Sequence, residues 1–200
     1  MFTGIVLDVG KVVSRESRGG DTRIVIAFDR LDASSINVGD SICVQGCCLT
    51  AVELRDHTFA ADVSRETLSL TTLGDLSPGS PVNLEPSLKA GDPLGGHLVS
   101  GHVDGVAEIA AMSGDARSTR IEVSVPPALA RSIARKGSVA IDGVSLTVNE
   151  VQGATFGVNL IPHTQAVTTL GALGVGTRVN LEVDQIARYV ERLLADLPAG

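Results

Sequence analysis

The chain has 200 residues, enough for a sizeable core, and its length allows either one large domain or two small ones. Hydrophobic residues make up 44% of the sequence and aromatic residues only 2%, so we expect an aliphatic core built largely from strands. The net charge of −7, with lysine and arginine scattered along the chain, leaves no basic surface for a phosphate backbone and argues against a nucleic-acid partner.

Short β-branched or alternating runs, separated by turn residues, predict six strands before residue 87. In chain order these are Gly4–Val13, Arg23–Phe28, Ser41–Val44, Leu49–Leu54, Thr58–Val63 and Val82–Glu85. A weak helical turn is expected over Glu66–Leu73. Six strands this short are best accommodated in a closed antiparallel barrel, because closure removes the exposed sheet edges.

The last segment, from Asp184 to Leu197, changes to a helical period. Apolar residues recur there at steps of three and four, with charged residues between them: Ile186, Tyr189, Val190, Leu193, Leu194 and Leu197. This pattern predicts an amphipathic helix. The helix could pack on its own barrel, but an appended helix with a free apolar stripe more often serves assembly.

The first part of the chain recurs in the second at a fixed offset. Thr58-Phe59 recurs as Thr155-Phe156, 97 positions later. At the same offset the Gly-x-x-Leu-Thr motif at Gly46 recurs at Gly143, and Val82-Asn83-Leu84-Glu85 recurs at Val179. The fold class is therefore all-β, with two homologous six-stranded antiparallel β-barrels in tandem plus a C-terminal α-helix.

The repeat also gives the expected domain boundaries. Residues 1–97 form the N-terminal barrel with a Gly- and Pro-rich linker, 98–183 form the C-terminal barrel, and 184–200 form the helix. No apolar run approaches the roughly 20 residues of a membrane helix, and the start lacks the features of a signal peptide. We therefore expect a soluble, cytoplasmic protein with no membrane partner.

The three cysteines, Cys43, Cys47 and Cys48, are crowded together in the first half. A disulfide framework needs an even, spread-out set, and a zinc site needs a second cysteine pair or histidines at ligand spacing. Neither pattern is present, so we expect reduced thiols and no metal site.

Four segments together carry a resemblance to a known family. They are Met1-Phe2-Thr3-Gly4-Ile5-Val6, Gly46-Cys47-Cys48-Leu49-Thr50, Gly95-Gly96-His97-Leu98-Val99-Ser100-Gly101-His102 and Asp142-Gly143-Val144-Ser145-Leu146-Thr147. In this order, inside a tandem repeat and before a C-terminal helix, they closely resemble the riboflavin synthase family over essentially the whole chain.

The resemblance implies a homotrimer held largely by the C-terminal helices, with the N-terminal barrel of one subunit facing the C-terminal barrel of another. Each barrel would bind one 6,7-dimethyl-8-ribityllumazine. One lumazine would give a four-carbon unit to the other, yielding riboflavin and 5-amino-6-(D-ribitylamino)uracil. No metal or cofactor is implied, because the acidic C7 methyl group leaves the protein mainly to align two rings and manage protons. An association with lumazine synthase is also suggested.

A donor and an acceptor need different sites, so differences between the aligned halves should mark the chemistry. Cys48 aligns with Ser145, and Ile5 aligns with His102. Positions that match in both halves, such as Thr50 and Thr147 or Thr67 and Thr164, suit a shared task such as hydrogen-bonding the ring and ribityl hydroxyls.

The candidate catalytic residues are Cys48, His102, Ser145 and Ser41. Cys48 offers a thiol for nucleophilic or positioning help, with a small buried hydrophobe as the alternative, which is what we expect of Cys47. His102 could carry a methyl proton, with a hydrogen-bonded structural histidine as its alternative. His97 looks more structural, and His57 looks solvated.

The residues expected to bind substrate fall on corresponding segments of the two halves. In the first half they are Gly4, Ile5, Val6, Cys48, Leu49, Thr50, Asp62, Val63, Ser64, Arg65, Glu66 and Thr67. In the second half they are Gly101, His102, Val103, Ser145, Leu146, Thr147, Asn159, Leu160, Ile161, Pro162, His163 and Thr164, together with Lys136 and Asp184. For Lys136 and Asp184 an unpaired surface charge is the alternative.

Two other functions fit the same architecture. A non-catalytic antenna protein that binds lumazine or flavin would keep the ligand contacts without the two-substrate site, and the two recognisable pocket motifs argue against it. A structural or protein-binding β module would leave the paired Gly-x-x-Leu-Thr motifs without a purpose.

Overall fold

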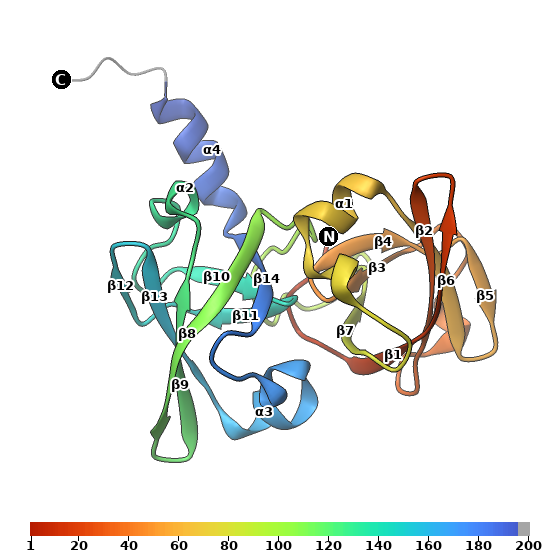
Figure 1. Ribbon diagram of the computed structural model, residues 1–200, viewed down its shortest axis with the longest axis horizontal. Coiled ribbons are helices and arrows are strands. Elements are labelled where there is room, and N and C mark those ends of the chain that lie inside the picture. Colours follow the sequence, from red (N-terminus) through yellow and green to blue (C-terminus); the bar gives the residue numbers. More distant parts are fainter. Residues whose placement is uncertain (196–200) are drawn as a thin grey trace.

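Two β lobes of nearly the same design make up the molecule, and one helix projects from the second lobe (Figure 1). The computed structural model describes residues 1–195. Over that range, none of the helices has the length and apolar character to cross a membrane.

The first lobe is a seven-stranded antiparallel sheet in the order β4-β3-β7-β1-β2-β6-β5. Its strands are β1 (Asp8–Arg18), β2 (Asp21–Ala27), β3 (Ser41–Val44), β4 (Cys47–Thr50), β5 (Glu53–Arg55), β6 (Thr58–Val63) and β7 (Pro81–Pro86). It also contains helix α1 (Arg65–Leu70) and 3₁₀ turns at Ala33–Ser35 and Thr72–Asp75.

The second lobe repeats this order as β11-β10-β14-β8-β9-β13-β12. Its strands are β8 (Gly105–Asp115), β9 (Ser118–Ser124), β10 (Ser138–Ile141), β11 (Val144–Thr147), β12 (Glu150–Gln152), β13 (Thr155–Leu160) and β14 (Arg178–Val183). Its helices are α2 (Pro127–Ala130) and α3 (Pro162–Val167), with a 3₁₀ turn at Thr169–Ala172, and α4 (Gln185–Leu194) follows β14. The expected tandem all-β fold is confirmed.

The number of strands per lobe differs from the expectation of six. The predicted strand Leu49–Leu54 is two strands, because the chain changes partner at its middle: Ala51 N donates to Asp40 O, and Val52 N donates to Ala60 O. β4 and β5 thus lie at opposite ends of the strand order, and this corner joins them. The sheet curls round until β4 lies near β6, so the corner helps to close the barrel.

The first predicted strand and the predicted helical turn also shift. The segment before Asp8 is not part of β1, because it leaves its own sheet to form backbone contacts with the other half: Phe2 and Val99 pair as an antiparallel bridge. The turn expected over Glu66–Leu73 is helix α1 followed by a 3₁₀ turn, with the break at Thr71 in an extended conformation.

Each lobe has its own aliphatic core inside its curled sheet. Alternate residues of β2, such as Ile24 and Ile26, point into the first core beside Phe59. Ile121 and Phe156 do the same in the second lobe. Burial of large aliphatic side chains at about 25 cal/mol per Å² supplies most of the stability of such lobes.

The two lobes meet through a reciprocal set of buried polar contacts. Asn83 on β7 donates from Nδ2 to the carbonyl of Asp142 at 2.9 Å, and its counterpart Asn180 on β14 donates to the carbonyl of Gln45 at 2.7 Å. Asn83 and Asn180 also accept backbone N–H groups from the 3₁₀ turns of the opposite lobe. Because these buried groups are paired across the junction, they fix how the lobes dock.

The C-terminal helix is confirmed as α4, which begins after Asp184, whose carboxylate accepts a hydrogen bond from Ile186 N. On the barrel side, Glu191 contacts Arg131 and Ser132. The apolar stripe faces outward, and its residues Ile186, Tyr189, Val190, Leu193 and Leu194 are exposed by 47–73%. The remainder of the expected helix and its Leu197 lie outside the described residues.

Asp142 is a buried carboxyl group at the lobe junction, and its counterpart in the first lobe is the neutral Gln45. Desolvation raises the pKa of Asp142 to about 7, although hydrogen bonds from Asn180 N and the Gln45 side chain act in the opposite direction. A raised pKa in the folded state means that stability is lost as the pH rises from about 4 to about 7.

We predict that Asp142→Asn removes this loss, because an amide keeps the bond from Asn180 N without carrying a charge. The stability gained over the wild type should grow from pH 4 to pH 7 and reach at most about 4 kcal/mol. Urea unfolding across this range would measure it. Asp56→Asn is the matched control, because Asp56 has a similar backbone φ (46° against 48°) but is exposed. A constant difference between variant and wild type at all pH values would contradict the prediction.

Candidate functional site

The outer face of the β3–β4 hairpin carries the thiol that the sequence singles out. Cys47 and Leu49 point into the protein, whereas Cys48 is half-buried on the opposite side of β4. Burial raises the pKa of the Cys47 thiol to about 12 and that of Cys43 well above its usual range. Cys43 and Cys47 are therefore neutral packing residues, and Cys48 is the accessible thiol.

Cys48 lies in a cavity of about 410 Å³ between the two halves of the sequence. The first half contributes β4 and α1, and the second half contributes the segment before β8. The lining residues are Cys47, Cys48, Glu66, Thr67, Leu70, Thr71, Gly101, His102 and Val103. Six predicted site residues, Cys48, Glu66, Thr67, Gly101, His102 and Val103, therefore meet in one place.

A second cavity of about 510 Å³ shares Cys48 and His102 with the first. Helix α4 forms its far wall with Gln185, Arg188, Tyr189 and Arg192, and Met1 and Ser100 complete the lining. Arg188 is fixed there, because its guanidinium donates to the carbonyl of His102 at 2.6 Å and to Asp104 at 2.9 Å. Cys48 and His102 thus line a cavity whose opposite wall includes the side chains of Arg188 and Arg192.

Ser145, the counterpart of Cys48, has an equivalent backbone setting in the second lobe. Cys48 N donates to Gly101 O, and Ser145 N donates to Gly4 O, both at 2.8 Å. Ser145 also carries a side-chain hydrogen bond, because its Oγ lies 2.7 Å from Nδ1 of His97. The two positions therefore have the same backbone hydrogen bond to the opposite lobe and differ in their side chains.

A buried glutamate holds each glycine segment in place. Glu85 accepts hydrogen bonds from the backbone N–H groups of Thr3 and Gly4 at 2.6 and 2.9 Å, and Glu182 does the same for Ser100 and Gly101 at 2.7 and 2.9 Å. Burial raises the pKa of Glu85, while the bonds from Thr3 and Gly4 lower it. Each segment is thereby fixed to its own lobe while its glycine carbonyl reaches the other.

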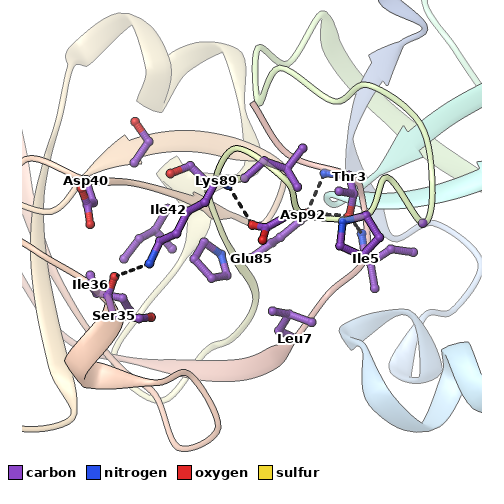
Figure 2. Close-up of a pocket in the computed structure, with 16 residues that line it drawn as sticks. Thr3, Ile5, Leu7, Ser35, Ile36, Asp40, Ile42, Glu85, Lys89 and Asp92 are labelled. Carbon is purple, nitrogen blue, oxygen red and sulfur yellow. Dashed lines mark hydrogen bonds between the residues drawn. The ribbon is translucent and has the colours of Figure 1, made fainter.

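A third cavity, of about 460 Å³, lies on the first lobe beneath the linker (Figure 2). Lys89 from the linker donates to the carbonyl of Ser35 across it. Of the predicted site residues, only Ile5 and Ser41 line this cavity. At the 97-residue offset its Thr3 and Ile5 correspond to Ser100 and His102. Because Ser100 lines only the cavity under α4, the third cavity is the counterpart of that one and not of the cavity beside α1.

Eight further predicted residues are core side chains, paired polar side chains or helix caps. Leu49, Val63, Leu146 and Leu160 have their side chains in the barrel cores. Asp62 is paired with Arg23 at 2.8 Å, and Asn159 contacts Arg120 and Asp115. Ser64 caps α1 and Asp184 caps α4.

The other predicted positions are more open. Ile161, Pro162 and His163 are exposed around the start of α3, Thr164 and Val6 are half-buried, and Thr50, Thr147, Arg65 and Lys136 are exposed. Lys136 has a positive φ of 68° and donates its backbone N–H to Val148 O. His57 is exposed as expected.

Several groups around the site were not assigned from the sequence. Arg188 and Tyr189 lie on the predicted helix, but only the fold shows that α4 reaches the cavity of Cys48. Glu85 and Glu182 recur in the Val-Asn-Leu-Glu repeat, which was the available signal. Among residues 1–195, no group of three or more His, Cys, Asp or Glu side chains could hold a metal ion.

Comparisons with known proteins agree on one family. The family model described as "Lumazine binding domain" matches residues 3–87 and again 100–184. A riboflavin synthase of Mycobacterium bovis is 48% identical over 97% of this chain and 98% of its own length. One from Photobacterium phosphoreum is 44% identical over 97% of this chain and 89% of its own length. The solved structure of LumP complexed with riboflavin has a TM-score of 0.84 and 27% identity, covering 92% of this chain and 99% of LumP.

The glycines at the two equivalent contacts should tolerate no side chain. Gly4 and Gly101 both have φ of +76°, and a Cβ would lie 2.6 Å from Ser145 Cβ or 2.7 Å from Cys48 Cβ. Gly176 has φ of +86° with open space around it. We predict that Gly176→Ala costs about 1–2 kcal/mol of unfolding free energy from backbone strain. Gly4→Ala and Gly101→Ala should each cost about 1–3 kcal/mol more from the added clash. Urea unfolding of the three variants would measure this, and equal losses in all three would contradict it.

Proposed function

The chain belongs to the riboflavin synthase family, and on that basis we propose that it converts two molecules of 6,7-dimethyl-8-ribityllumazine into riboflavin and 5-amino-6-(D-ribitylamino)uracil. The reaction moves a four-carbon unit from one lumazine to the other, so the chain acts as a transferase. The same barrel must therefore be present twice, once for the donor and once for the acceptor.

The observation that carries this proposal is the pair of equivalent but chemically different positions at Cys48 and Ser145. Both lie on the outer face of a hairpin, and the backbone N–H of each donates to a glycine carbonyl of the opposite half at 2.8 Å. One position offers a thiol with His102 in the same cavity, and the other offers a hydroxyl beside His97. Two identical molecules held in such sites meet different groups, as a donor and an acceptor require.

We also infer that each active site lies between two subunits. Within one chain both positions adjoin a buried cluster of Phe2, Cys43, Val99 and Ala140, because Cys48 pairs with Cys43 on β3 and Ser145 pairs with Ala140 on β10. We infer that this cluster keeps two rings bound in one chain apart. A donor ring in one chain can reach an acceptor ring only if the outer face of one barrel meets that of another chain.

The outward stripe of α4 supplies a means of assembly. Leu193 and Ile186 are exposed by 73% and 68%, which is unusual for large apolar side chains that recur on one helix face. Three such helices around an axis would bury the stripe, so we propose a homotrimer. The cytoplasmic location and an association with lumazine synthase stay predictions from the family resemblance.

A second candidate function is ligand binding without turnover. It is favoured by the solved structures of LumP, which hold riboflavin, 6,7-dimethyl-8-(1'-D-ribityl) lumazine or flavin mononucleotide on a similar fold. The two functions differ in the fate of bound lumazine, because a binding protein leaves it unchanged.

The deciding experiment incubates the purified protein with the ribityl-lumazine alone. We expect one riboflavin and one ribitylamino-uracil for every two lumazines consumed, followed by absorbance and chromatography. The rate should be the same with a metal chelator present, because the acidic methyl group needs no Lewis acid to lose its proton. Tight binding with no product would favour the antenna function. A rate restored only by a divalent ion would contradict the metal-free reaction.

The placement of the site between subunits predicts complementation. One variant carries Cys48→Ala and Thr50→Ala, and the other carries Ser145→Ala and Thr147→Ala, each nearly inactive alone. In mixed trimers some interfaces join an intact N-terminal barrel to an intact C-terminal barrel, so activity should return after subunit exchange. Mass spectrometry would establish that mixed trimers have formed.

The control adds Leu193→Asp to both damaged chains. A charge in the stripe should prevent assembly and abolish the rescue, whereas Val175→Asp, at an equally open position (66% exposed) away from α4, should leave it intact. If mixed trimers form and no activity returns, both substrates must bind within one chain.

A further inference from the structure

The backbone of two glycines and the imidazole of His97 lie close to Ser145. Gly4 and Gly96 lie so close that a Cβ on either would come within 2.6 or 2.9 Å of Ser145 Cβ. Nδ1 of His97 lies 2.7 Å from Ser145 Oγ, a short hydrogen bond for this pair of atoms. Ser145 is nevertheless only half-buried.

His97, at the end of the linker, is fixed by its backbone. Its backbone N–H donates to Thr3 O at 3.1 Å, and the residue is 9% exposed. Its second ring nitrogen, Nε2, is buried and has no hydrogen-bond partner among residues 1–195. Among residues 1–195 the ring therefore has one hydrogen-bond partner, the hydroxyl of Ser145.

The orphaned nitrogen indicates which way the hydrogen bond runs. A buried N–H without an acceptor is rarer than a buried acceptor without a donor, so the proton of the neutral ring belongs on Nδ1. Burial lowers the pKa of His97, and the carboxylate of Asp184 only partly opposes this, which keeps the ring neutral near pH 7. Nδ1–H then donates to Ser145 Oγ.

We propose that His97 is a positioning residue for the C-terminal barrel: by donating from Nδ1 it occupies a lone pair of Ser145 Oγ and turns the serine O–H toward the bound lumazine. Ser145 is then a directed donor to a ring or ribityl acceptor. This role rests on the function proposed above, since it assigns Ser145 to the substrate. No proton is transferred in this arrangement, so His97 shapes the site without entering the reaction.

A tautomer measurement tests the arrangement without any substrate. In ligand-free protein labelled with ¹⁵N-histidine at pH 7.5, long-range ¹H–¹⁵N spectra should show a protonated Nδ1 and a bare Nε2 for His97. The signal is assigned by its loss in His97→Asn. A proton on Nε2, or on both nitrogens, would overturn the proposal whether or not the protein makes riboflavin.

Two substitutions of similar size separate positioning from packing. The amide of His97→Asn falls near the place of Nδ1 and can still donate to Ser145, whereas that of His97→Gln falls near the place of Nε2 and cannot. We expect Asn to retain most of kcat/KM and Gln to lose roughly 3- to 10-fold, the value of one hydrogen bond. His57→Gln, at the exposed turn of the first lobe, is the control for a generic loss of imidazole.

The final comparison places His97→Gln in a Ser145→Ala background. If His97 acts through the serine, the Gln substitution should cost nothing further there, in turnover or in lumazine affinity measured by fluorescence titration. Equal losses for Asn and Gln, or an undiminished loss for Gln without the serine hydroxyl, would overturn the proposal. A wild-type protein that makes no riboflavin would instead contradict the proposed function, and the tautomer result would stand apart from it.

Discussion

The architecture depends on one repeated contact, in which a glycine peptide joins a buried glutamate of its own lobe to the site position of the other lobe. Glu85 holds Gly4 while Gly4 O accepts from Ser145 N, and Glu182 holds Gly101 while Gly101 O accepts from Cys48 N. A carboxylate that is this buried persists only with such donors. As a result, neither barrel forms its pocket from its own residues alone.

The repeat in the sequence was enough to predict the lobes but not their exchange of segments. Strands Ser41–Val44 and Thr58–Val63 lie where their alternation placed them, since their periodicity is local. The corner at Ala51 is invisible to periodicity, because both halves of the predicted strand Leu49–Leu54 are extended and only the hydrogen-bond partner changes. The same limit hid the position of Gly4, which the 97-residue offset matched to Gly101 without indicating that the carbonyl of each contacts the opposite lobe.

Where the site prediction followed the offset, the fold places the predicted residues in corresponding positions, but the sequence carries no signal for neighbours that only distant packing brings together. The alignment of Cys48 with Ser145 identified two positions that the fold does place in equivalent frames. His97 looked structural because it lies at the end of the linker, and nothing local connects it with a serine 48 positions away. Residues of α4 such as Arg188 carried only an amphipathic pattern, which describes the helix and not the cavity it closes.

The difference between the two pockets therefore has two sources. One is substitution at equivalent positions, such as Cys48 for Ser145 or Gln45 for Asp142. The other is the pair of segments that the repeat does not include: the linker brings His97 to Ser145, and α4 brings Arg188 and Tyr189 to the cavity of Cys48 and His102. A strictly repeated chain would have two like pockets. Because each unrepeated segment serves only one of them, it can change one pocket's polarity and access without disturbing the shared frame, and this is what a reaction between two identical molecules in unlike roles requires.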